Sequence, residues 1–322
     1  MSIFIQKAGI LTTVQDLGRR GFRRFGINPG GVMDARAARL INILLGNDEN
    51  ETVIEIHFPA AEIRFEKPCI FAIGGAEMTP NLDGENIDNW RIYNAKRGDV
   101  LKFSQKKHGN RTYLAIRGGF AIDKWLGSSS TNLTAAIGGF EGRKLQNGDR
   151  LKFRQAKQTA HHPRFAQKIS PSLIPHYSRF PTVRVIAGAE FEQLDGDNKK
   201  KFENTGFTVS NDSNRMGFRL NGEALTLEKP MEIVSSAVSF GTIQLLPDGQ
   251  MIALMADHQT SGGYPRIAHV IDHDLPVIAQ LGSRDQVAFH LISLAEAEYL
   301  SLTVEKEIAF LKTGVRFASN QY

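Results

Sequence analysis

The chain of 322 residues has little cysteine and no long apolar run. Its single cysteine, Cys69, cannot form an internal disulfide, which excludes a disulfide-stapled fold. No window approaches the roughly 20 apolar residues that a membrane-spanning helix needs. Residues 1–7 lack the basic start, the long apolar centre and the small-residue cleavage site of a secretory signal. These absences predict a cytoplasmic protein.

Familiar nucleotide-binding and catalytic motifs are also missing. The sequence contains no phosphate-binding loop that ends in Gly-Lys-Ser/Thr and no Gly-x-Gly-x-x-Gly fingerprint. It contains no Gly-x-Ser-x-Gly nucleophile elbow, no His-Glu-x-x-His zinc helix and no Met-Lys-Met biotinylation site. Any use of ATP or biotin would therefore depend on another chain or on an unconventional site.

The charge balance does not point to nucleic acid. Lysine and arginine number 39 against 34 aspartate and glutamate residues, which gives a formal net charge of +5. The longest basic run, 199–201, is short and has no interleaved aromatic residue. Hydrophobic residues make up 41% and charged residues 23%, which is typical of one large or two globular domains.

Two isolated features have plain structural explanations. Cys69 lies in the apolar run 69–73, and a buried strand cysteine is a better interpretation than a nucleophile. His269 and His273 have a spacing that suits a metal on one helix face. The residues between them look strand-like, which would separate the imidazoles, so no metal site is predicted.

Short alternating or apolar runs dominate the chain and predict strands. They cover residues 2–7, 53–58, 62–65, 69–73, 113–116, 183–187 and 251–256. Glycine, with 30 residues, falls between the runs, often in Gly-Asp or Gly-Gly turns. The pattern is typical of barrels or sandwiches and predicts a mainly β fold with a few helices.

Two segments predict helices. Asp34 is a good N-cap for a helix over 35–45 that has one apolar face, and Gly46 provides its stop. A second helix is predicted from 293 to about 311, where apolar residues recur at helical spacing. The β-branched pair Thr303-Val304 in its interior argues against that full extent.

A weak internal repeat suits a fold built from two similar halves. Residues 98–103 (GDVLKF) return almost unchanged at 148–153 (GDRLKF), with a looser copy at 283–289. Chance or common hairpin chemistry would also explain the repeat. The segment 156–181 is rich in His, Gln, Ser and Pro and predicts a connection. It separates a predicted N-terminal β-rich domain, 1–155, from a predicted C-terminal barrel domain, 182–322.

Three glycine-rich polar segments, at 9–34, 210–220 and 241–265, carry the candidate site residues. Glycines let the backbone approach a ligand closely. The last part of the third segment, 257–265, directly follows the strand predicted at 251–256. The alternative is a set of surface loops whose polar groups cap neighbouring elements. Asp34, for example, is already explained as a helix cap.

Six motifs in order resemble the allophanate-hydrolase-subunit-2 family, which is also called KipA-like. They are Thr13-x-Gln15-Asp16-x-Gly18-Arg19, Gly30-Gly31-x-Met33-Asp34, Gly127-Ser128-Ser129-Ser130-Thr131, Gly139-x-x-Gly142-Arg143-x-Leu145, Arg215-Met216-Gly217-x-Arg219-Leu220 and the block 257–265. Each motif alone is weak, but six in order over most of the chain are specific. The departures from the family pattern are Ser261 in place of Thr, Leu281-Gly282-Ser283 in place of a Pro-Gly turn, and Leu246-Pro247 in place of two prolines.

The resemblance implies two cyclophilin-like β-barrel subdomains, similar to half of the carboxyltransferase region of urea carboxylase. It also implies one component of a multi-chain, ATP-dependent 5-oxoprolinase, which opens 5-oxoproline to L-glutamate. The implied partners are the KipI-like B subunit and the lactam-opening A subunit, and ATP is consumed at the level of the complex. A lactam is a poor electrophile, and phosphorylation of its oxygen would create a leaving group.

The motif residues suit this chemistry by residue type, and we predict a catalytic group among them. Asp16 and Asp257 are candidates to take a proton or to activate water. Tyr264 is a candidate to donate to an oxyanion. Gln15 and Gln259 are candidates to bind the amide edge, and Gln259 is counted with the catalytic group.

A second group is predicted to bind the substrate or a phosphate. Arg19 and Arg215 can each make a planar two-point contact with a carboxylate or phosphate. The other predicted binding residues are Thr13, Gln15, Asp34, Arg143, Gln244, Thr260, Gly262 and Gly263.

Two other functions stay open. The first is biotin-dependent carboxyl transfer onto urea or a similar amide, which needs a biotin carboxylase and a carrier domain from other chains. The second is a non-catalytic regulator that binds a KipI-like inhibitor of a histidine kinase. Biotin is expected only under the first of these alternatives.

Overall fold

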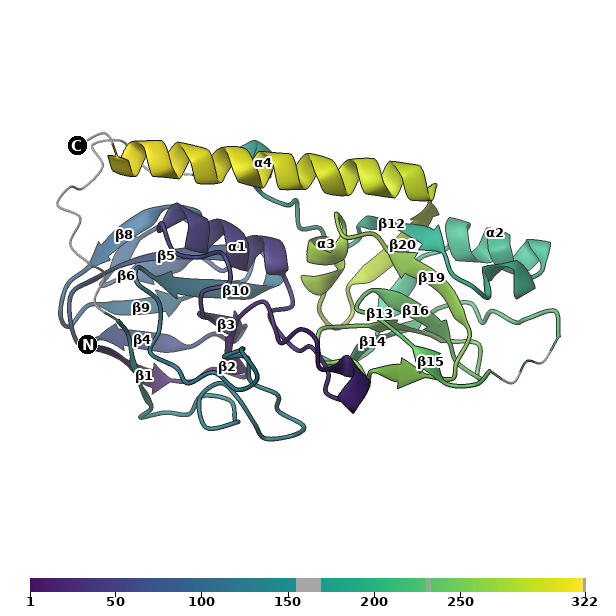
Figure 1. Ribbon diagram of the computed structural model, residues 1–322, viewed down its shortest axis with the longest axis horizontal. Coiled ribbons are helices and arrows are strands. Elements are labelled where there is room, and N and C mark those ends of the chain that lie inside the picture. Colours follow the sequence, from purple (N-terminus) through teal and green to yellow (C-terminus); the bar gives the residue numbers. More distant parts are fainter. Residues whose placement is uncertain (155–168, 230, 232, 321–322) are drawn as a thin grey trace. The chain divides into compact units, whose positions relative to one another are not determined.

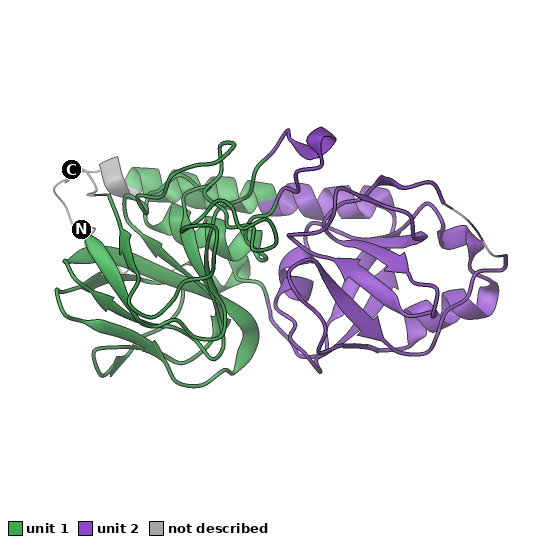
Figure 2. Cartoon of the chain, turned by 90° about the horizontal axis from the view of Figure 1, so that it is seen from below, with its two compact units in different colours: residues 1–19, 30–175, 305–322 green, residues 20–29, 176–304 purple. Residues whose placement is uncertain are grey.

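The computed structural model describes residues 1–154, 169–229, 231 and 233–320. The chain divides into two compact units, coloured separately in Figure 2. Unit 1 comprises residues 1–19, 30–175 and 305–322, and unit 2 comprises 20–29 and 176–304. The first half of the predicted connection, up to residue 168, lies outside the described residues. Two features of this division were not predicted. Residues 20–29 belong to unit 2, and residues 305–322 belong to unit 1.

Unit 1 is built from two sheets, seen at the left of Figure 1. The six-stranded sheet has the order β11 (Arg150–Lys152), β1 (Ser2–Lys7), β4 (Glu62–Phe65), β9 (Val100–Phe103), β6 (Pro80–Leu82) and β7 (Glu85–Asn86). The five-stranded sheet has the order β2 (Thr12–Gln15), β3 (Val53–His57), β10 (His108–Ile116), β5 (Cys69–Glu77) and β8 (Ile92–Ala95). All of their pairings are antiparallel.

The two sheets share one apolar core. The alternating residues of β1 and β3, such as Ile3, Ile5, Ile54 and Ile56, are fully buried in it. Val14 of β2 lies opposite Ile54 and belongs to the same core. Because successive strand residues point to opposite faces, Thr13, Gln15 and Glu55 point away from this core. The five-stranded sheet therefore carries a second, polar face.

Helix α1 (Ala35–Leu44) begins where the sequence predicts. The Asp34 carboxylate accepts a hydrogen bond from the Ala37 amide at 2.9 Å, which confirms the N-cap. The helix packs on β5, where Gly74 has no side chain to keep it away. A Cβ at Gly74 would lie 2.6 Å from Ile41 and 2.5 Å from Trp90. Absence of a side chain on the strand thus allows the close helix–sheet contact.

Unit 2 is a closed barrel of seven strands. Its order is β12 (Thr182–Ala187), β19 (Arg266–Val270), β16 (Thr242–Leu245), β17 (Met251–Leu254), β14 (Gly217–Asn221), β13 (Phe207–Val209) and β20 (Gln286–Leu291). Only β12 and β20 pair in parallel. A short extra sheet joins β15 (Ser236–Ala237) to β18 (Ser261–Gly262). The prediction of a mainly β protein with a barrel is confirmed.

Aromatic rings fill one end of the barrel. Phe202, from α2 (Gly196–Asn204), stacks on Phe289 of β20 with ring centroids 5.1 Å apart. Phe207 of β13 lies 5.9 Å from Phe289, and Phe191 lies 6.0 Å from Phe202. Among the described residues, the other helical elements are α3 (Leu275–Ala279), the longer α4 (Leu294–Asn320), and short 3-10 turns at Arg23–Phe25, Pro171–Leu173 and Phe191–Gln193.

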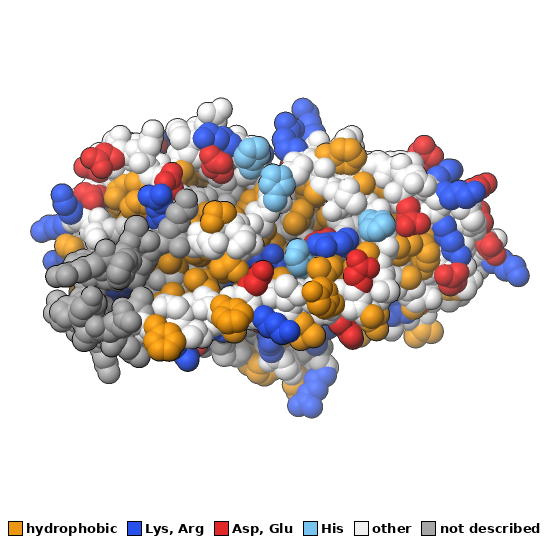
Figure 3. All heavy atoms as spheres, turned by 90° about the horizontal axis from the view of Figure 1, so that it is seen from above, with side chains coloured by type: hydrophobic (Ala, Val, Ile, Leu, Met, Phe, Trp, Pro, Cys, Tyr) orange, Lys and Arg blue, Asp and Glu red, His pale blue; other side chains and the backbone are white. Residues whose placement is uncertain are grey.

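Helix α4 is longer than predicted. It continues through Thr303, whose hydroxyl donates to the Tyr299 carbonyl at 2.9 Å and is thereby satisfied inside the helix. Its later part is tied to α1 by Arg39, which donates to Glu305 at 2.6 and 2.8 Å. In the part of the chain that the structure describes, no helix is long and apolar enough to cross a membrane. Apolar and charged side chains are interspersed on the surface in Figure 3.

Candidate functional site

In unit 1, the Asp16 carboxylate is the centre of a buried network. One carboxylate oxygen accepts from the Gly18 amide at 2.8 Å and from the Ser128 and Ser130 hydroxyls, both at 2.6 Å. The other accepts from the Ser129 amide at 2.7 Å and the Ser129 hydroxyl at 3.1 Å. Five donors use the acceptor capacity of a carboxylate fully. The geometry therefore favours a positioning role for Asp16, and its predicted role in proton transfer stays a prediction.

Arg19 is buried under the same loop. Its guanidinium donates to the Ser130 carbonyl and lies over the Trp125 ring, 5.0 Å from the ring centroid. Only 1% of Arg19 is exposed, so a ligand phosphate or carboxylate would have to enter this loop to reach it. Its predicted binding role stays a prediction.

Gln15 and Thr13 lie side by side on the polar face of β2. The Gln15 amide nitrogen donates to the Thr13 hydroxyl at 3.1 Å and to the Thr131 carbonyl at 3.3 Å. Thr131 is itself fixed to β2, because its amide and hydroxyl both donate to the Val14 carbonyl at 3.0 and 2.9 Å. The structure thus brings the first and third motifs together.

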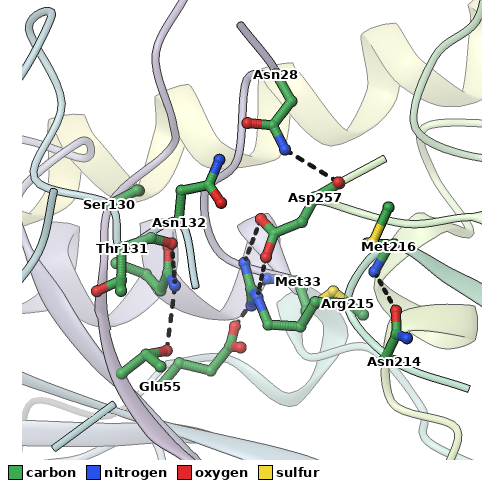
Figure 4. A network of polar contacts seen from close by, with 12 residues as sticks. Asn28, Met33, Glu55, Ser130, Thr131, Asn132, Asn214, Arg215, Met216 and Asp257 are labelled. Carbon is green, nitrogen blue, oxygen red and sulfur yellow. Dashed lines mark hydrogen bonds and ion pairs between the residues drawn. The ribbon is translucent and has the colours of Figure 1, made fainter. Parts of the chain in front are cut away.

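Sequence reasoning missed the neighbouring pair Glu55 and Tyr113. The Glu55 carboxylate accepts from the Tyr113 hydroxyl at 2.9 Å and from the Met33 amide at 2.8 Å, and Figure 4 labels both Glu55 and Met33. Burial, with the nearby Glu55 and Asp34 charges, raises the pKa of Tyr113 well above its usual value. Glu55 faces Thr13 across the β2–β3 pairing. A carboxylate inside an otherwise apolar strand was the signal that could have found it.

Two predicted binding residues of unit 1 have other partners. Asp34 is the N-cap of α1, as the sequence predicts. Arg143 donates to both oxygens of Asp149, at 2.7 and 3.0 Å, and to Glu141 at 2.6 Å. These ion pairs raise the pKa of Arg143 and hold its side chain at the turn before β11.

In unit 2, Arg215 and Asp257 form a buried two-point ion pair, drawn in Figure 4. Two nitrogens of the guanidinium donate to the two carboxylate oxygens at 2.8 and 3.2 Å. The Asp257 amide also donates to the Arg215 carbonyl at 2.8 Å, and the Asn28 side chain donates to the Asp257 carbonyl at 3.0 Å. Binding a substrate carboxylate through Arg215, or taking a proton with Asp257, would require the pair to exchange partners. Both roles stay predictions.

The residues of the block 257–265 differ in exposure and in their contacts. Gln259 is exposed, and the ring of Tyr264 is 45% exposed. The Thr260 carbonyl accepts from the Val238 amide at 3.3 Å, and Gly263 lies near Ser235. Gln244 is fully buried beneath this block, and its amide nitrogen donates to the Tyr264 carbonyl at 3.2 Å.

Two histidines of unit 2, His258 and His269, were not predicted as site residues. His269 contacts the Thr242 hydroxyl at 3.1 Å, and burial, with the nearby Arg266, lowers the pKa of His269. Burial also lowers the pKa of His258. Within the described residues no group of three or more metal-ligating side chains comes together. His273 instead contacts Asp274 and Arg184, each at 2.8 Å.

Cys69 lies at the first position of β5, as the strand interpretation predicts. Burial, together with the charge of Asp99, raises the pKa of its thiol to about 12. The thiolate is the nucleophilic form of cysteine, so Cys69 is unreactive at neutral pH.

Comparison with known proteins places these motifs in context. Residues 25–291 match the family described as carboxyltransferase domain, subdomain A and B. The C subunit of 5-oxoprolinase from Haemophilus influenzae is 40% identical over 89% of this chain and 90% of that protein. Its counterpart in Escherichia coli is 38% identical over 91% of this chain and 92% of that protein. The crystal structure of the K. lactis urea amidolyase has a TM-score of 0.89 at 28% identity, over 96% of this chain and 20% of that one.

Proposed function

The chain belongs to the carboxyltransferase-domain family, subdomains A and B, and from this premise we propose that it is the C subunit of a 5-oxoprolinase. One observation carries the proposal. The chain matches the C subunit of a 5-oxoprolinase with 40% identity over nine-tenths of both proteins. At that coverage the two chains correspond along about nine-tenths of their lengths and not through one shared domain.

The proposed reaction is the opening of 5-oxoproline to L-glutamate. Transfer of a phosphoryl group from ATP to the lactam oxygen breaks the amide resonance and leaves ADP. Water then adds to the ring carbon and the carbon–nitrogen bond breaks, which gives the free amine and an acyl phosphate. A second water displaces the phosphate from that carbon, which becomes the glutamate side-chain carboxylate. The enzyme must hold the ring and stabilise the charge that develops on oxygen.

We assign the roles in this chain from the buried polar groups. Arg215 exchanges its contact with Asp257 for the substrate carboxylate or a phosphate, since a guanidinium matches either in a two-point contact. Asp257, once released, is positioned to accept a proton. Tyr264, with its exposed ring, donates to the oxyanion, while Asp16 holds the loop 128–130 in place.

The relatives are each named as the C subunit of their enzyme, which supports an assembly with further chains. We propose the KipI-like B subunit and the lactam-opening A subunit as the partners, in the cytoplasm. ATP is then used by the assembled complex.

The test is release of glutamate from 5-oxoproline and ATP, with this chain alone and with the A and B subunits added. Activity only in the full set is the expected result. An assembled complex that releases no glutamate would refute the proposal. Asp257→Asn is expected to abolish release without loss of assembly. Asp197→Asn is the matched control, because its carboxylate lies on the exposed surface of α2 with 88% of the side chain accessible.

The second candidate is the carboxyl-transfer step of a urea amidolyase-type system. It is favoured by the fold similarity to the K. lactis urea amidolyase, at a TM-score of 0.89. The chain corresponds to only 20% of that protein, however, which leaves its other parts without a counterpart in the match. This candidate would be selected if carboxyl transfer requires a biotinylated carrier and the complex does not release glutamate from 5-oxoproline and ATP.

A further inference from the structure

Gln244 of unit 2 carries a buried oxygen that has no hydrogen-bond donor among the residues that the structure describes. The side chain is fully buried on β16, and its amide nitrogen donates to the Tyr264 carbonyl at 3.2 Å. Reversal of the amide would place two carbonyl oxygens against each other, so this contact fixes the orientation. Among the described residues, no donor reaches the Gln244 Oε1 atom. Buried carbonyl groups in proteins nearly always have a donor.

Part of the cover over this carboxamide is the short β15–β18 ladder, which meets it at Gly262. Ser236 pairs with Gly262 and Ala237 with Ser261, and the Val238 amide donates to the Thr260 carbonyl beside them. Because the ladder is this short, we expect it to open locally at a lower free-energy cost than the strands of the barrel. Exposed apolar side chains flank it, with 89% of Val234 and 45% of Tyr264 accessible.

Gly262 lies directly against the glutamine. A Cβ at this position would lie 2.7 Å from the Gln244 amide nitrogen and 3.4 Å from its oxygen. The Gly262 backbone is not in the left-handed region, so its conformation does not demand glycine. A side chain at this position would instead push the Gln244 carboxamide aside.

The surroundings of the carboxamide carry little unpaired charge. Arg266 donates to both oxygens of Glu190, at 3.1 and 2.7 Å, so its positive charge is paired with that carboxylate. Burial, with the nearby Arg266, lowers the pKa of His269, so its imidazole is neutral at neutral pH. Thr242, on the same strand face as Gln244, is neutral as well. This environment suits a neutral N–H donor and not an ion.

We propose that the Gln244 side-chain oxygen accepts a hydrogen bond from the amide N–H of the substrate, beneath the β15–β18 ladder. This inference rests on the proposed function, in which the donor is the ring N–H of 5-oxoproline. Gln244 is then a specificity-determining residue that recognises a lactam and rejects rings without the N–H group. A site built around a buried acceptor discriminates strongly, since an analogue without the donor leaves that acceptor unpaired.

The test compares 5-oxoproline with its ring-oxygen analogue, 5-oxotetrahydrofuran-2-carboxylate, in which oxygen replaces the N–H group. In the assembled complex, the KM for 5-oxoproline and the inhibition constant of the analogue are measured from glutamate release. For the wild type, the lactam is expected to be favoured by at least about tenfold. Gln244→Met keeps the side-chain length without the acceptor, and it is expected to reduce the preference to less than about threefold.

Gly262→Ala tests the same atom from the opposite side. Its methyl group displaces the carboxamide, so it is expected to reduce the preference without removing Gln244. In the double variant the two effects are expected to be non-additive, because both act through one group. Gly196→Ala is the matched control, since a Cβ there meets nothing within 4 Å, and it is expected to keep the wild-type preference.

The outcomes distinguish a failure of the role of Gln244 from a failure of the proposed function. A wild-type complex that binds lactam and analogue equally overturns the role of Gln244 without any variant. Glutamate release with an unchanged lactam preference in Gln244→Met and Gly262→Ala overturns it as well, even if overall activity falls. A wild-type complex that releases no glutamate refutes the proposed function, and this inference fails with it.

Discussion

Replacement of Asp16 by asparagine tests whether this carboxylate holds the loop 128–130. Each oxygen of Asp16 accepts from one backbone amide, Gly18 at 2.8 Å and Ser129 at 2.7 Å. In the asparagine variant one oxygen becomes an NH2 group, which must face one of these two amides. Hydroxyl groups can turn to become acceptors, but a backbone N–H cannot. Either orientation of the new side chain therefore leaves a buried donor facing a donor.

The magnitude follows from the hydrogen bonds that the substitution removes. Hydrogen bonds to a charged group contribute about 1.5–3 kcal/mol each, and a buried donor left without a partner costs about 1–3 kcal/mol. Because the serine hydroxyls can reorient, we expect a net loss of about 2–4 kcal/mol in the free energy of unfolding of unit 1. With a urea m-value of about 2 kcal/mol/M, the unfolding midpoint falls by about 1–2 M.

Tryptophan fluorescence is the right assay for this change. The chain has two tryptophans, Trp90 and Trp125, and both lie in unit 1. Asp48→Asn is the matched control, because Asp48 makes the same local contact, to the Asn50 amide at 2.8 Å, on an exposed turn. Asparagine is well tolerated in such turns, so the control is expected to lie within about 0.5 kcal/mol of the wild type.

One result would refute the positioning role. If Asp16→Asn unfolds within about 1 kcal/mol of the wild type and yet has no activity in the complex, the carboxylate acts in chemistry. Asp16 would then return as the candidate proton acceptor. A large loss of stability, shared by Ser129→Ala to a smaller degree, is the outcome that supports the network.

Two further predictions concern unit 2. Although burial opposes the shift, hydrogen bonds from Arg184 and His273 hold the pKa of Asp274 far below its usual value of 3.8. The ionised carboxylate therefore stabilises the folded state above about pH 4, and this stabilisation is lost as the pH falls below that value. The difference in unfolding free energy between wild type and Asp274→Asn, followed by circular dichroism in urea, should therefore be large at pH 7 and shrink below pH 4, whereas a difference independent of pH would contradict this. Phe202→Ala removes the ring stacked on Phe289 at 5.1 Å and is expected to cost about 3–5 kcal/mol in the same assay. A loss below about 1 kcal/mol would mean that the barrel end collapses around the missing ring.

Local sequence signals were sufficient for several of the longer elements. Strands β1 and β4 have the predicted bounds, and α1 ends one residue earlier than predicted. Asp34 and Gly46 mark the ends of that helix by chemistry that acts within a few residues. The extent of α4 was underestimated, because the hydroxyl of Thr303 finds a partner one turn earlier in the same helix.

The candidate site was only partly visible in the sequence. The first motif contains Gln15 and Asp16, and the polar segment 241–265 contains Gln244; these residues were named because amide and carboxylate groups among glycines stand out. The motifs did not identify Glu55 and Tyr113, whose contact at 2.9 Å depends on the pairing of β3 with β10. Nor did they indicate that the buried Asp16 carboxylate accepts hydrogen bonds from serines more than a hundred residues away. The bond from the Ser128 hydroxyl is one of these.

By itself the sequence determined the β-rich character, the first helix and the family to which the motifs belong. These depend on residue periodicity, capping and local order, all of which act over short distances along the chain. The tertiary structure alone decided that Asp16 is saturated, that Arg215 and Asp257 bind each other, and that the Gln244 oxygen lacks a partner among the described residues. Hydrogen-bond occupancy depends on which segments far apart in the sequence meet in the folded chain, as Asp16 and Ser128 do, and the sequence of one segment does not show this.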